Sequence, residues 1–171
     1  MNYGIVIFPP RDVQDLANSF RKRYDPRYSL IPPHITLKYP FQLKERKLED
    51  VVSHLEKVAE RTEPFQIEFH KVSTFHPTTN VVYLAIRNEE PVIRLHEQCN
   101  EGILYDEETY SYVPHLTIAQ EMTNAELNDI YGTLRMKDIN ITAEIDRFHL
   151  LYQMENEMWT VYQTFLFNKK K

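Results

Sequence analysis

Two short histidine-containing stretches hold the residues that could do chemistry in this chain. Pro33-His34-Ile35-Thr36-Leu37 returns 81 residues later as Pro114-His115-Leu116-Thr117-Ile118. In both stretches polar residues alternate with apolar ones, which is typical of a β-strand with one buried face. Each histidine then shares a strand face with the threonine two residues further on, about 6.6 Å away. We interpret the pair of stretches as one duplicated device.

The residue types in these stretches suit proton transfer beside a phosphate. An imidazole has an ordinary pKa of about 6.5, so at neutral pH one ring can accept a proton while a second, charged ring donates one. Threonine hydroxyls can donate hydrogen bonds to the non-bridging oxygens of a phosphate. Two histidines and two threonines around one phosphorus atom predict in-line displacement at a phosphodiester. One histidine would activate water or a ribose hydroxyl, and the other would protonate the leaving oxygen.

The paired His-x-Thr-x motifs, His34 to Leu37 and His115 to Ile118, resemble those of the 2H phosphoesterase superfamily. That superfamily includes LigT-like 2′-5′ RNA ligases and cyclic phosphodiesterases. At this length and motif spacing, the whole chain is most similar to its bacterial YjcG-like phosphoesterases. The resemblance implies a bilobed α+β fold with the motifs in a central cleft. It also implies a hydrolase of ester bonds that needs no metal or other cofactor.

The same resemblance implies substrates and roles for the motif residues. The substrate would be a small nucleotide or an RNA end with a cyclic or 2′-5′ phosphodiester bond. His34 would be the proton donor and His115 the proton acceptor, with Thr36 and Thr117 holding the phosphate. Because a near-symmetric pair exchanges roles when the reaction runs backwards, the division between the two histidines stays open.

Other side chains near the motifs are further candidates for substrate contacts. Lys38 follows His34 and Thr36 on the same predicted strand face, whereas Ala119 holds the equivalent place after the second motif. We therefore add Lys38 as a candidate phosphate contact, the alternative being that its side chain extends into solvent. The residues that could either stack on a base or belong to the core are Tyr28, Tyr39, Phe41 and Gln120.

Composition restricts the partners and the compartment. The net charge of −5 argues against a broad basic surface, so no DNA duplex is expected as a partner. The cluster Arg21, Lys22, Arg23 and Arg27 is expected to be a solvated helix end. A single cysteine, Cys99, excludes a disulfide within the chain and suits a reducing compartment. With no long apolar segment, we expect a cytoplasmic protein without a membrane anchor.

Hydrophobic periodicity predicts a mixed succession of strands and helices. Strands are predicted over 3–8, 35–41, 65–75, 81–86, 114–118, 139–151 and 158–167, and helices over 13–24, 44–61, 90–101 and 124–134. Thr123 is the predicted N-cap of the last helix. The order strand, helix, motif strand recurs, and Pro10 and Pro91 are also 81 residues apart. We therefore predict a single α+β domain over residues 1–171, with two pseudo-symmetric lobes of antiparallel strands around a central cleft.

Three other interpretations of the motifs compete with a two-histidine enzyme. A metal site would normally use three or four ligands, and a strand supplying two would have His-x-His rather than His-x-Thr. A serine hydrolase would need a Gly-x-Ser-x-Gly turn, which this sequence lacks. A non-catalytic protein that binds an RNA end or a cyclic nucleotide in the same cleft stays open. The remaining histidines, which we expect to be non-catalytic, are His54, His70, His76, His96 and His149.

Overall fold

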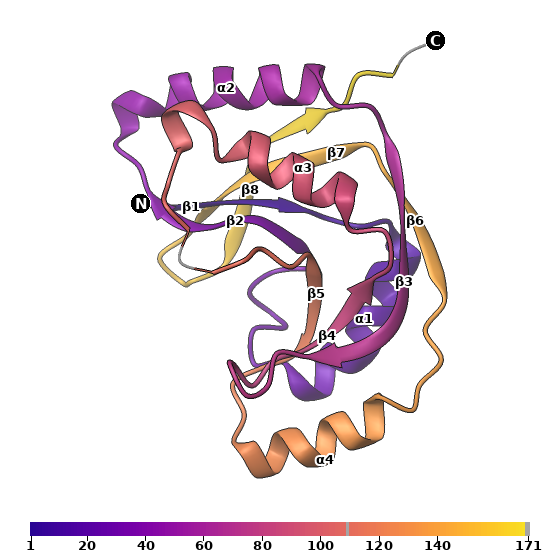
Figure 1. Cartoon of the computed structure of the whole chain (residues 1–171). Coiled ribbons are helices and arrows are strands. Elements are labelled where there is room, and N and C mark those ends of the chain that lie inside the picture. The colour runs from indigo at the N-terminus through magenta and orange to yellow at the C-terminus, as the bar shows by residue number, and fades with distance from the viewer. Residues whose placement is uncertain (109, 170–171) are drawn as a thin grey trace.

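Figure 1 shows the computed structural model of the chain, which describes residues 1–108 and 110–169. The strands in this part of the chain are β1 (Asn2–Ile7), β2 (Ile35–Gln42), β3 (Phe65–Thr74), β4 (Val82–Ile86), β5 (His115–Ala119), β6 (Ile141–Ile145), β7 (Arg147–Gln153) and β8 (Trp159–Leu166). The helices are α1 (Arg11–Tyr24), α2 (Leu48–Glu60), α3 (Glu90–Cys99) and α4 (Asn124–Leu134), with short 3₁₀ turns η1 (Glu45–Lys47) and η2 (Gly102–Leu104). The predicted elements are all present, with shifts of a few residues at their ends.

The strands form one curled antiparallel sheet in the order β6-β3-β4-β5-β2-β1-β7-β8. The two motif strands, β2 and β5, are neighbours at its centre. Each is followed outward by three strands, so the lobes are the two halves of a single sheet. The predicted α+β class with antiparallel strands is confirmed. The pairing of β2 with β5 places the two motifs on adjacent strands at the centre of the sheet.

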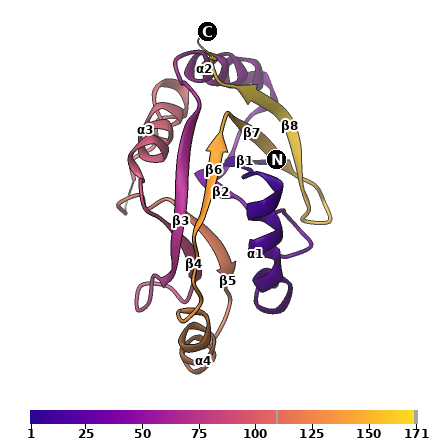
Figure 2. The same ribbon diagram turned by 90° about the vertical axis from the view of Figure 1, so that its right-hand side faces the viewer.

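The helices cover the sheet so that the two halves of the chain interlock. Figure 2 shows α1 and α3 on opposite sides of the strands, with α2 and α4 at opposite ends of the molecule. Helix α1 precedes β2 in the chain but packs against β5, and α3 precedes β5 but packs against β2. Each motif strand is therefore supported by the helix that belongs to the other motif.

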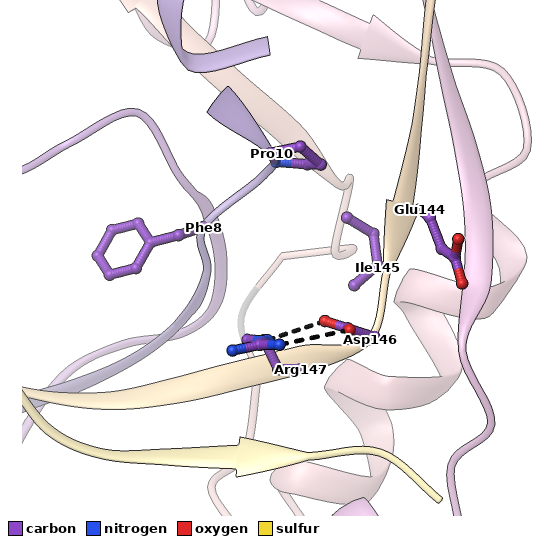
Figure 3. A pocket seen from close by; sticks show the side chains of 6 residues that line it. All are labelled: Phe8, Pro10, Glu144, Ile145, Asp146 and Arg147. Carbon is purple, nitrogen blue, oxygen red and sulfur yellow. Dashed lines mark hydrogen bonds and ion pairs between the residues drawn. The ribbon is translucent and has the colours of Figure 1, made fainter. Parts of the chain in front are cut away.

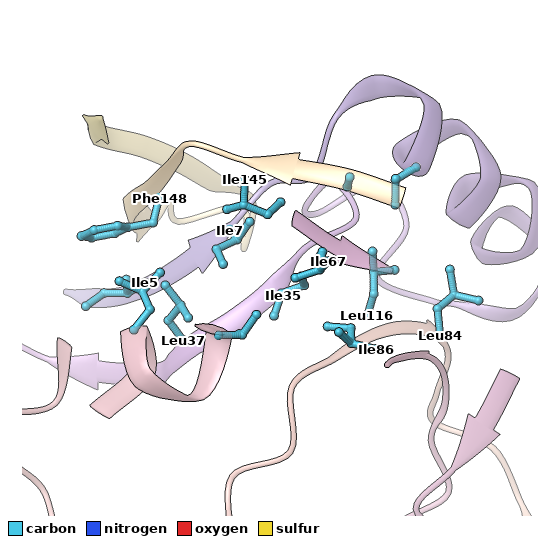
Figure 4. Packing of buried hydrophobic residues seen from close by; sticks show 14 of the residues in the cluster. Ile5, Ile7, Ile35, Leu37, Ile67, Leu84, Ile86, Leu116, Ile145 and Phe148 are labelled. Carbon is cyan, nitrogen blue, oxygen red and sulfur yellow. The ribbon is translucent and has the colours of Figure 1, made fainter. Parts of the chain in front are cut away.

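The apolar positions of the motifs lie in the core, as their alternation predicts. Ile35 and Leu37 of β2 and Leu116 and Ile118 of β5 are completely buried. Figure 4 shows how Ile35, Leu37 and Leu116 pack with apolar side chains from the neighbouring strands. Burying a side chain of this size stabilises the fold by about 1.5–3 kcal/mol. The core therefore fixes which face of each motif strand is turned away from it.

One predicted strand is two strands in the structure. The alternation over 139–151 is shared between β6 and β7, which meet at Asp146. Strand β6 pairs with β3 at one end of the sheet, whereas β7 pairs with β1 and β8 in the other half. The chain thus crosses from one half of the sheet to the other at Asp146, where the buried apolar positions shift from Ala143 and Ile145 to Phe148 and Leu150.

The start of α4 agrees with the prediction. Thr123 accepts a hydrogen bond from the backbone N–H of Glu126, and the Glu126 carboxylate accepts one from the backbone N–H of Thr123. This reciprocal capping box satisfies two donors at the helix N-terminus. Among the described residues, no helix combines the length and the apolar character needed to cross a membrane.

Candidate active site

A cleft of about 650 Å³ lies over the centre of the sheet, and the predicted site residues line it. They are His34 and Thr36 from the first motif, His115 and Thr117 from the second, and Lys38. A volume of this size is typical of a site for a small organic ligand. The two motifs, 81 residues apart in the sequence, thus border one space.

The two histidine rings are oriented by the same kind of local hydrogen bond to the backbone. His34 Nδ1 lies 2.9 Å from the carbonyl oxygen of Pro32, and His115 Nδ1 lies 2.8 Å from that of Val113. A carbonyl oxygen only accepts, so each Nδ1 carries the proton and donates it. In the neutral rings Nε2 is then left as a free proton acceptor. Both imidazoles are oriented by the residue two positions before them.

Burial makes both histidines harder to protonate than a histidine in water. It lowers the pKa of His34 to about 4, helped by the charges of Arg21 and His115 and opposed by the Pro32 carbonyl and Asp25. Burial also lowers the pKa of His115, while the Val113 carbonyl favours its charged form. Charging one ring therefore disfavours charging the other, as expected of two histidines that share a site.

Aromatic rings form the wall beside His115. The ring of Phe75 is perpendicular to that of His115 at 4.8 Å between centroids, and the ring of Tyr83 lies 5.3 Å from it. Phe75 and Tyr83 stack on each other at 4.2 Å. Tyr83 is the partner of Thr117 across the β4–β5 pair. The sequence alone did not indicate these two residues, because only the strand register brings them to the motif.

A buried ion pair supports the cleft on the side of His34. Arg21 Nε lies 3.2 Å from Asp25 Oδ2, and both side chains are 2% exposed. Asp25 Oδ1 also accepts a hydrogen bond from Gln120 Nε2 at 2.9 Å, which links the end of α1 to the end of β5. The prediction of a solvated basic cluster is wrong for Arg21, which also donates to the Ile31 carbonyl. Gln120 lines the cleft, with its amide group committed to Asp25.

The Lys38 side chain is buried and hydrogen-bonded rather than extended into solvent. Its ammonium donates to Asn100 Oδ1 at 2.9 Å and to the Leu104 carbonyl at 3.1 Å, and neither residue lines the cleft. The β1–β2 register shifts on both sides of Ile5, the partner of Lys38, so the regular alternation from Thr36 is broken there. Burial lowers the pKa of Lys38. Its contact with phosphate stays a prediction, and would require the ammonium to leave these two partners.

The other candidates for base contacts are divided between surface and core. Tyr39 is 62% exposed at the rim of the cleft, and Tyr28 is 41% exposed. Phe41 packs against the core and the Tyr3 ring. Trp159 of β8 lines the cleft although it lies 125 residues from His34 in the sequence. No local pattern around Trp159 pointed to this position.

A second, smaller pocket of about 130 Å³ lies where β6 passes into β7 (Figure 3). Its charged side chains include Asp146 and Arg147, which pair with each other at 2.9 Å. Over the described ranges of the chain, no three or more histidine, cysteine, aspartate or glutamate side chains are grouped as metal ligands would be. The larger cleft is therefore the candidate active site.

Comparison with known sequences matches this chain to one family along most of its length. The model of the 2′-5′ RNA ligase superfamily matches residues 9–157. A protein of Geobacillus sp. strain WCH70 is 49% identical over 171 residues, covering 100% of this chain and 99% of the relative. A protein of Oceanobacillus iheyensis is 50% identical over 169 residues, with 99% of both chains covered. Both relatives bear the name "Putative phosphoesterase".

Solved structures share the fold at low sequence identity. A Thermus thermophilus protein superposes with a TM-score of 0.73 and 17% identity, covering 100% of both chains. Escherichia coli LigT in complex with 3′-AMP has a TM-score of 0.71 and 15% identity, with 98% of both chains covered. These similarities extend over the whole sheet and its helices, including both motif strands.

Proposed function

Because the chain belongs to the 2′-5′ RNA ligase superfamily, we propose that it is a phosphoesterase that cleaves cyclic or 2′-5′ phosphodiester bonds by two-histidine acid–base catalysis. The substrate would be a small nucleotide or an RNA end. The names of the relatives support the phosphoesterase class, and the complex of LigT with 3′-AMP supports a nucleotide ligand. The groups that line the cleft support the type of reaction.

The observation that carries the proposal is the matched anchoring of the two imidazoles. Each Nδ1 proton is donated to a backbone carbonyl, which leaves Nε2 of both His34 and His115 for chemistry in the same cleft. A neutral Nε2 accepts a proton from the attacking hydroxyl, and a protonated Nε2 donates one to the leaving oxygen. Each transfer contributes about a hundred- to ten-thousand-fold in rate.

A bound phosphodiester anion would change the protonation of the two histidines. Burial lowers the pKa of both, so the neutral forms dominate in the free protein at pH 7. An anion bound between the rings favours the protonated form of one of them, which then serves as the acid. We assign His34 as the donor and His115 as the acceptor in the cleavage direction. Thr36 and Thr117 would hold the non-bridging oxygens through their hydroxyls.

The first test is turnover of 2′,3′-cyclic nucleotides and a 2′-5′-linked dinucleotide in the presence of EDTA. We expect activity that survives EDTA and falls at least about a hundredfold in both His34→Ala and His115→Ala. His70→Ala is the matched control, since His70 lies in a strand outside the cleft and should leave the rate unchanged.

Each alternative outcome has a distinct meaning. Activity that EDTA abolishes would assign the site to a metal. Unchanged rates in either cleft variant would contradict the two-histidine mechanism. Ligand binding without turnover of any panel member would favour the non-catalytic binding protein.

A further inference from the structure

On the side of His34, the cleft continues beyond the motif residues over an apolar surface. We name this surface the apolar shelf and define it by Gly4, Val6, Leu30, Leu151 and Trp159, all of which line the cleft. Val6 and Leu151 are almost completely buried, so they form its floor. A phosphate needs several hydrogen-bond donors and positive charge, whereas these side chains carry no charge and offer only the indole N–H of Trp159 as a donor. The shelf therefore suits a different part of a ligand.

Trp159 is brought to the shelf from two strands away. It begins β8, pairs with Gln153 of β7, and donates its backbone N–H to the Leu30 carbonyl at 2.9 Å. Its indole atoms Cζ3 and Cη2 lie 3.5 and 3.8 Å from where a Cβ on Gly4 of β1 would be. The ring thus reaches across β7 to β1. A half-buried indole lies beside the motif strand β2, which is the neighbour of β1.

The shelf lies within one nucleoside of the predicted phosphate position. Thr36 pairs directly with Val6 across the β1–β2 ladder, and Gly4 is two residues from Val6 on the same strand. A Cβ on Gly4 would lie 3.9 Å from the carbonyl oxygen of Lys38, which is two residues beyond Thr36, so the shelf begins directly beside the motif strand. A ribose attached to a phosphate between the histidines is long enough to bring its base to Trp159.

Charge at the edge of the shelf favours a neutral occupant. Glu157 lines the same end of the cleft, and its carboxylate would repel a second phosphate there. On the His115 side, the Phe75 ring is already stacked on Tyr83 and perpendicular to His115. Trp159 is therefore the better placed ring for stacking on a ligand. A planar, uncharged nucleobase fits this combination of an aromatic ring and aliphatic floor.

We infer that the apolar shelf is a nucleobase subsite in which the base of the nucleoside next to His34 stacks on Trp159. This inference rests on the proposed function, because it assumes a nucleotide whose phosphate lies between the two motifs. Base stacking on an aromatic side chain is tolerant of base identity and stronger for the larger purine rings. A purine nucleotide should therefore bind more tightly than a pyrimidine one.

The chain offers a direct probe, because Trp159 is its single tryptophan. We would titrate the unmodified protein with adenosine 3′-monophosphate and, separately, with inorganic phosphate, and record tryptophan fluorescence. Stacking predicts saturable quenching by the nucleotide and little change with phosphate. A nucleotide that binds by calorimetry without changing the emission would overturn the inference, as would the absence of nucleotide binding up to millimolar concentration.

Variants then separate stacking from folding. We expect Trp159→Ala to raise the dissociation constant of adenosine 3′-monophosphate about tenfold or more, with that of phosphate changed less than about twofold. Trp159→Phe should restore most of the affinity. Tyr162→Ala is the matched control, since Tyr162 is an exposed aromatic residue of β8 that does not line the cleft. Equal affinity losses in Trp159→Ala and Tyr162→Ala would contradict the subsite.

These binding measurements do not depend on turnover. Quenching together with base-dependent affinity, but without cleavage of any panel substrate, would reject the proposed reaction and retain the subsite. Cleavage without quenching would reject the subsite and retain the reaction.

Discussion

His34 and His115 have the same hydrogen bond to their own backbone but different surroundings. His115 is enclosed by Phe75 and Tyr83, whereas the positive charge of Arg21 helps to lower the pKa of His34. Burial is the largest cause of the lowered pKa of both rings, so the pKa of each ring depends on how well it is shielded from solvent. An anion that enters the cleft changes the surroundings of both rings and favours the charged form of an imidazole. Anion binding and histidine protonation are therefore coupled.

Burial of His34 in its neutral form predicts a pH dependence of stability. The pKa of His34 is about 4 in the folded protein and about 6.5 when unfolded, so the unfolded state binds more protons between these values. Stability should therefore fall as pH drops from about 6.5 towards 4. His34→Asn removes this contribution, and should reduce the loss of unfolding free energy between pH 7 and pH 5 by up to about 2 kcal/mol. Urea denaturation at both pH values measures it.

The His34→Asn variant should still lose some stability between pH 7 and pH 5, because other histidines are affected by burial. Burial also lowers the pKa of His115 and His149, so both proteins should still be less stable at pH 5 than at pH 7. An identical loss in the variant and the unmodified protein would show that His34 is not held in its neutral form.

At the scale of the elements, the contact between the two motif strands is short. The register joins β2 to β5 at the single pair Ile35 and Leu116. Beyond it, the carbonyl of Thr36 accepts a hydrogen bond from the Tyr112 hydroxyl at 2.6 Å, and the carbonyl of Leu37 accepts one from His96 Nδ1 at 2.6 Å. Side chains thus satisfy backbone groups of β2 after it separates from β5.

Tyr112, which lies shortly before His115, and His96 of α3 contact each other and further side chains. The rings of Tyr112 and His96 stack at 3.7 Å and 5°. His96 also contacts the Glu108 carboxylate, and Asn100 donates to the Leu37 carbonyl. The His96 side chain thus connects α3, to which it belongs, with β2. These contacts are consistent with its predicted non-catalytic role. This network holds the second motif against the first.

Tyr112→Phe tests how much the Tyr112 hydroxyl stabilises the fold by bonding the Thr36 carbonyl in place of a neighbouring strand. Removing the hydroxyl leaves the partly buried Thr36 carbonyl without its side-chain donor, which should cost about 1 kcal/mol of unfolding free energy. Tyr105→Phe, in the same segment but 74% exposed, is the control and should change stability by less than about 0.5 kcal/mol. Denaturant titration of the three proteins compares them. Equal midpoints would mean that solvent replaces the Tyr112 hydroxyl at no cost.

At the scale of the whole molecule, the two halves are joined by exchanged helices as well as by the sheet. Helix α1 supports β5, α3 supports β2, and the Arg21, Asp25 and Gln120 side chains fasten the end of α1 to the end of β5. Asp25 accepts from both Arg21 and Gln120, so one carboxylate serves both connections. The cleft is therefore bounded by parts of the chain that support one another.

Asp25→Asn should destabilise the whole protein because it leaves the Arg21 guanidinium buried without its counter-ion. Breaking a buried pair in this way costs about 3 kcal/mol or more. Glu90→Gln is the matched control, because the Arg94–Glu90 pair has the same spacing but is exposed, and its loss should cost less than about 0.5 kcal/mol. Thermal and urea unfolding would measure both. Similar small losses in the two variants would show that the Arg21–Asp25 pair does not stabilise the fold.

The sequence by itself determined the local features of this protein. The alternation around His34 and His115 identified two strands with buried aliphatic faces, and the 3.6-residue periodicity located the four helices of the described residues. Thr123 predicted the cap of α4. These features follow from the covalent geometry of short segments, in which residues a few positions apart necessarily share a face. For the same reason, the sequence could nominate the four motif residues before the sheet was known.

Only the tertiary structure decided where the distant segments meet. It divided the 139–151 alternation between the two halves of the sheet, turned the Lys38 ammonium towards Asn100, and buried Arg21 against Asp25. It also carried Trp159 to the cleft. Strand register, helix packing and burial depend on contacts between residues far apart in the chain, and local periodicity contains no record of them. The motifs therefore specify the chemistry, while the fold selects the surfaces that surround it.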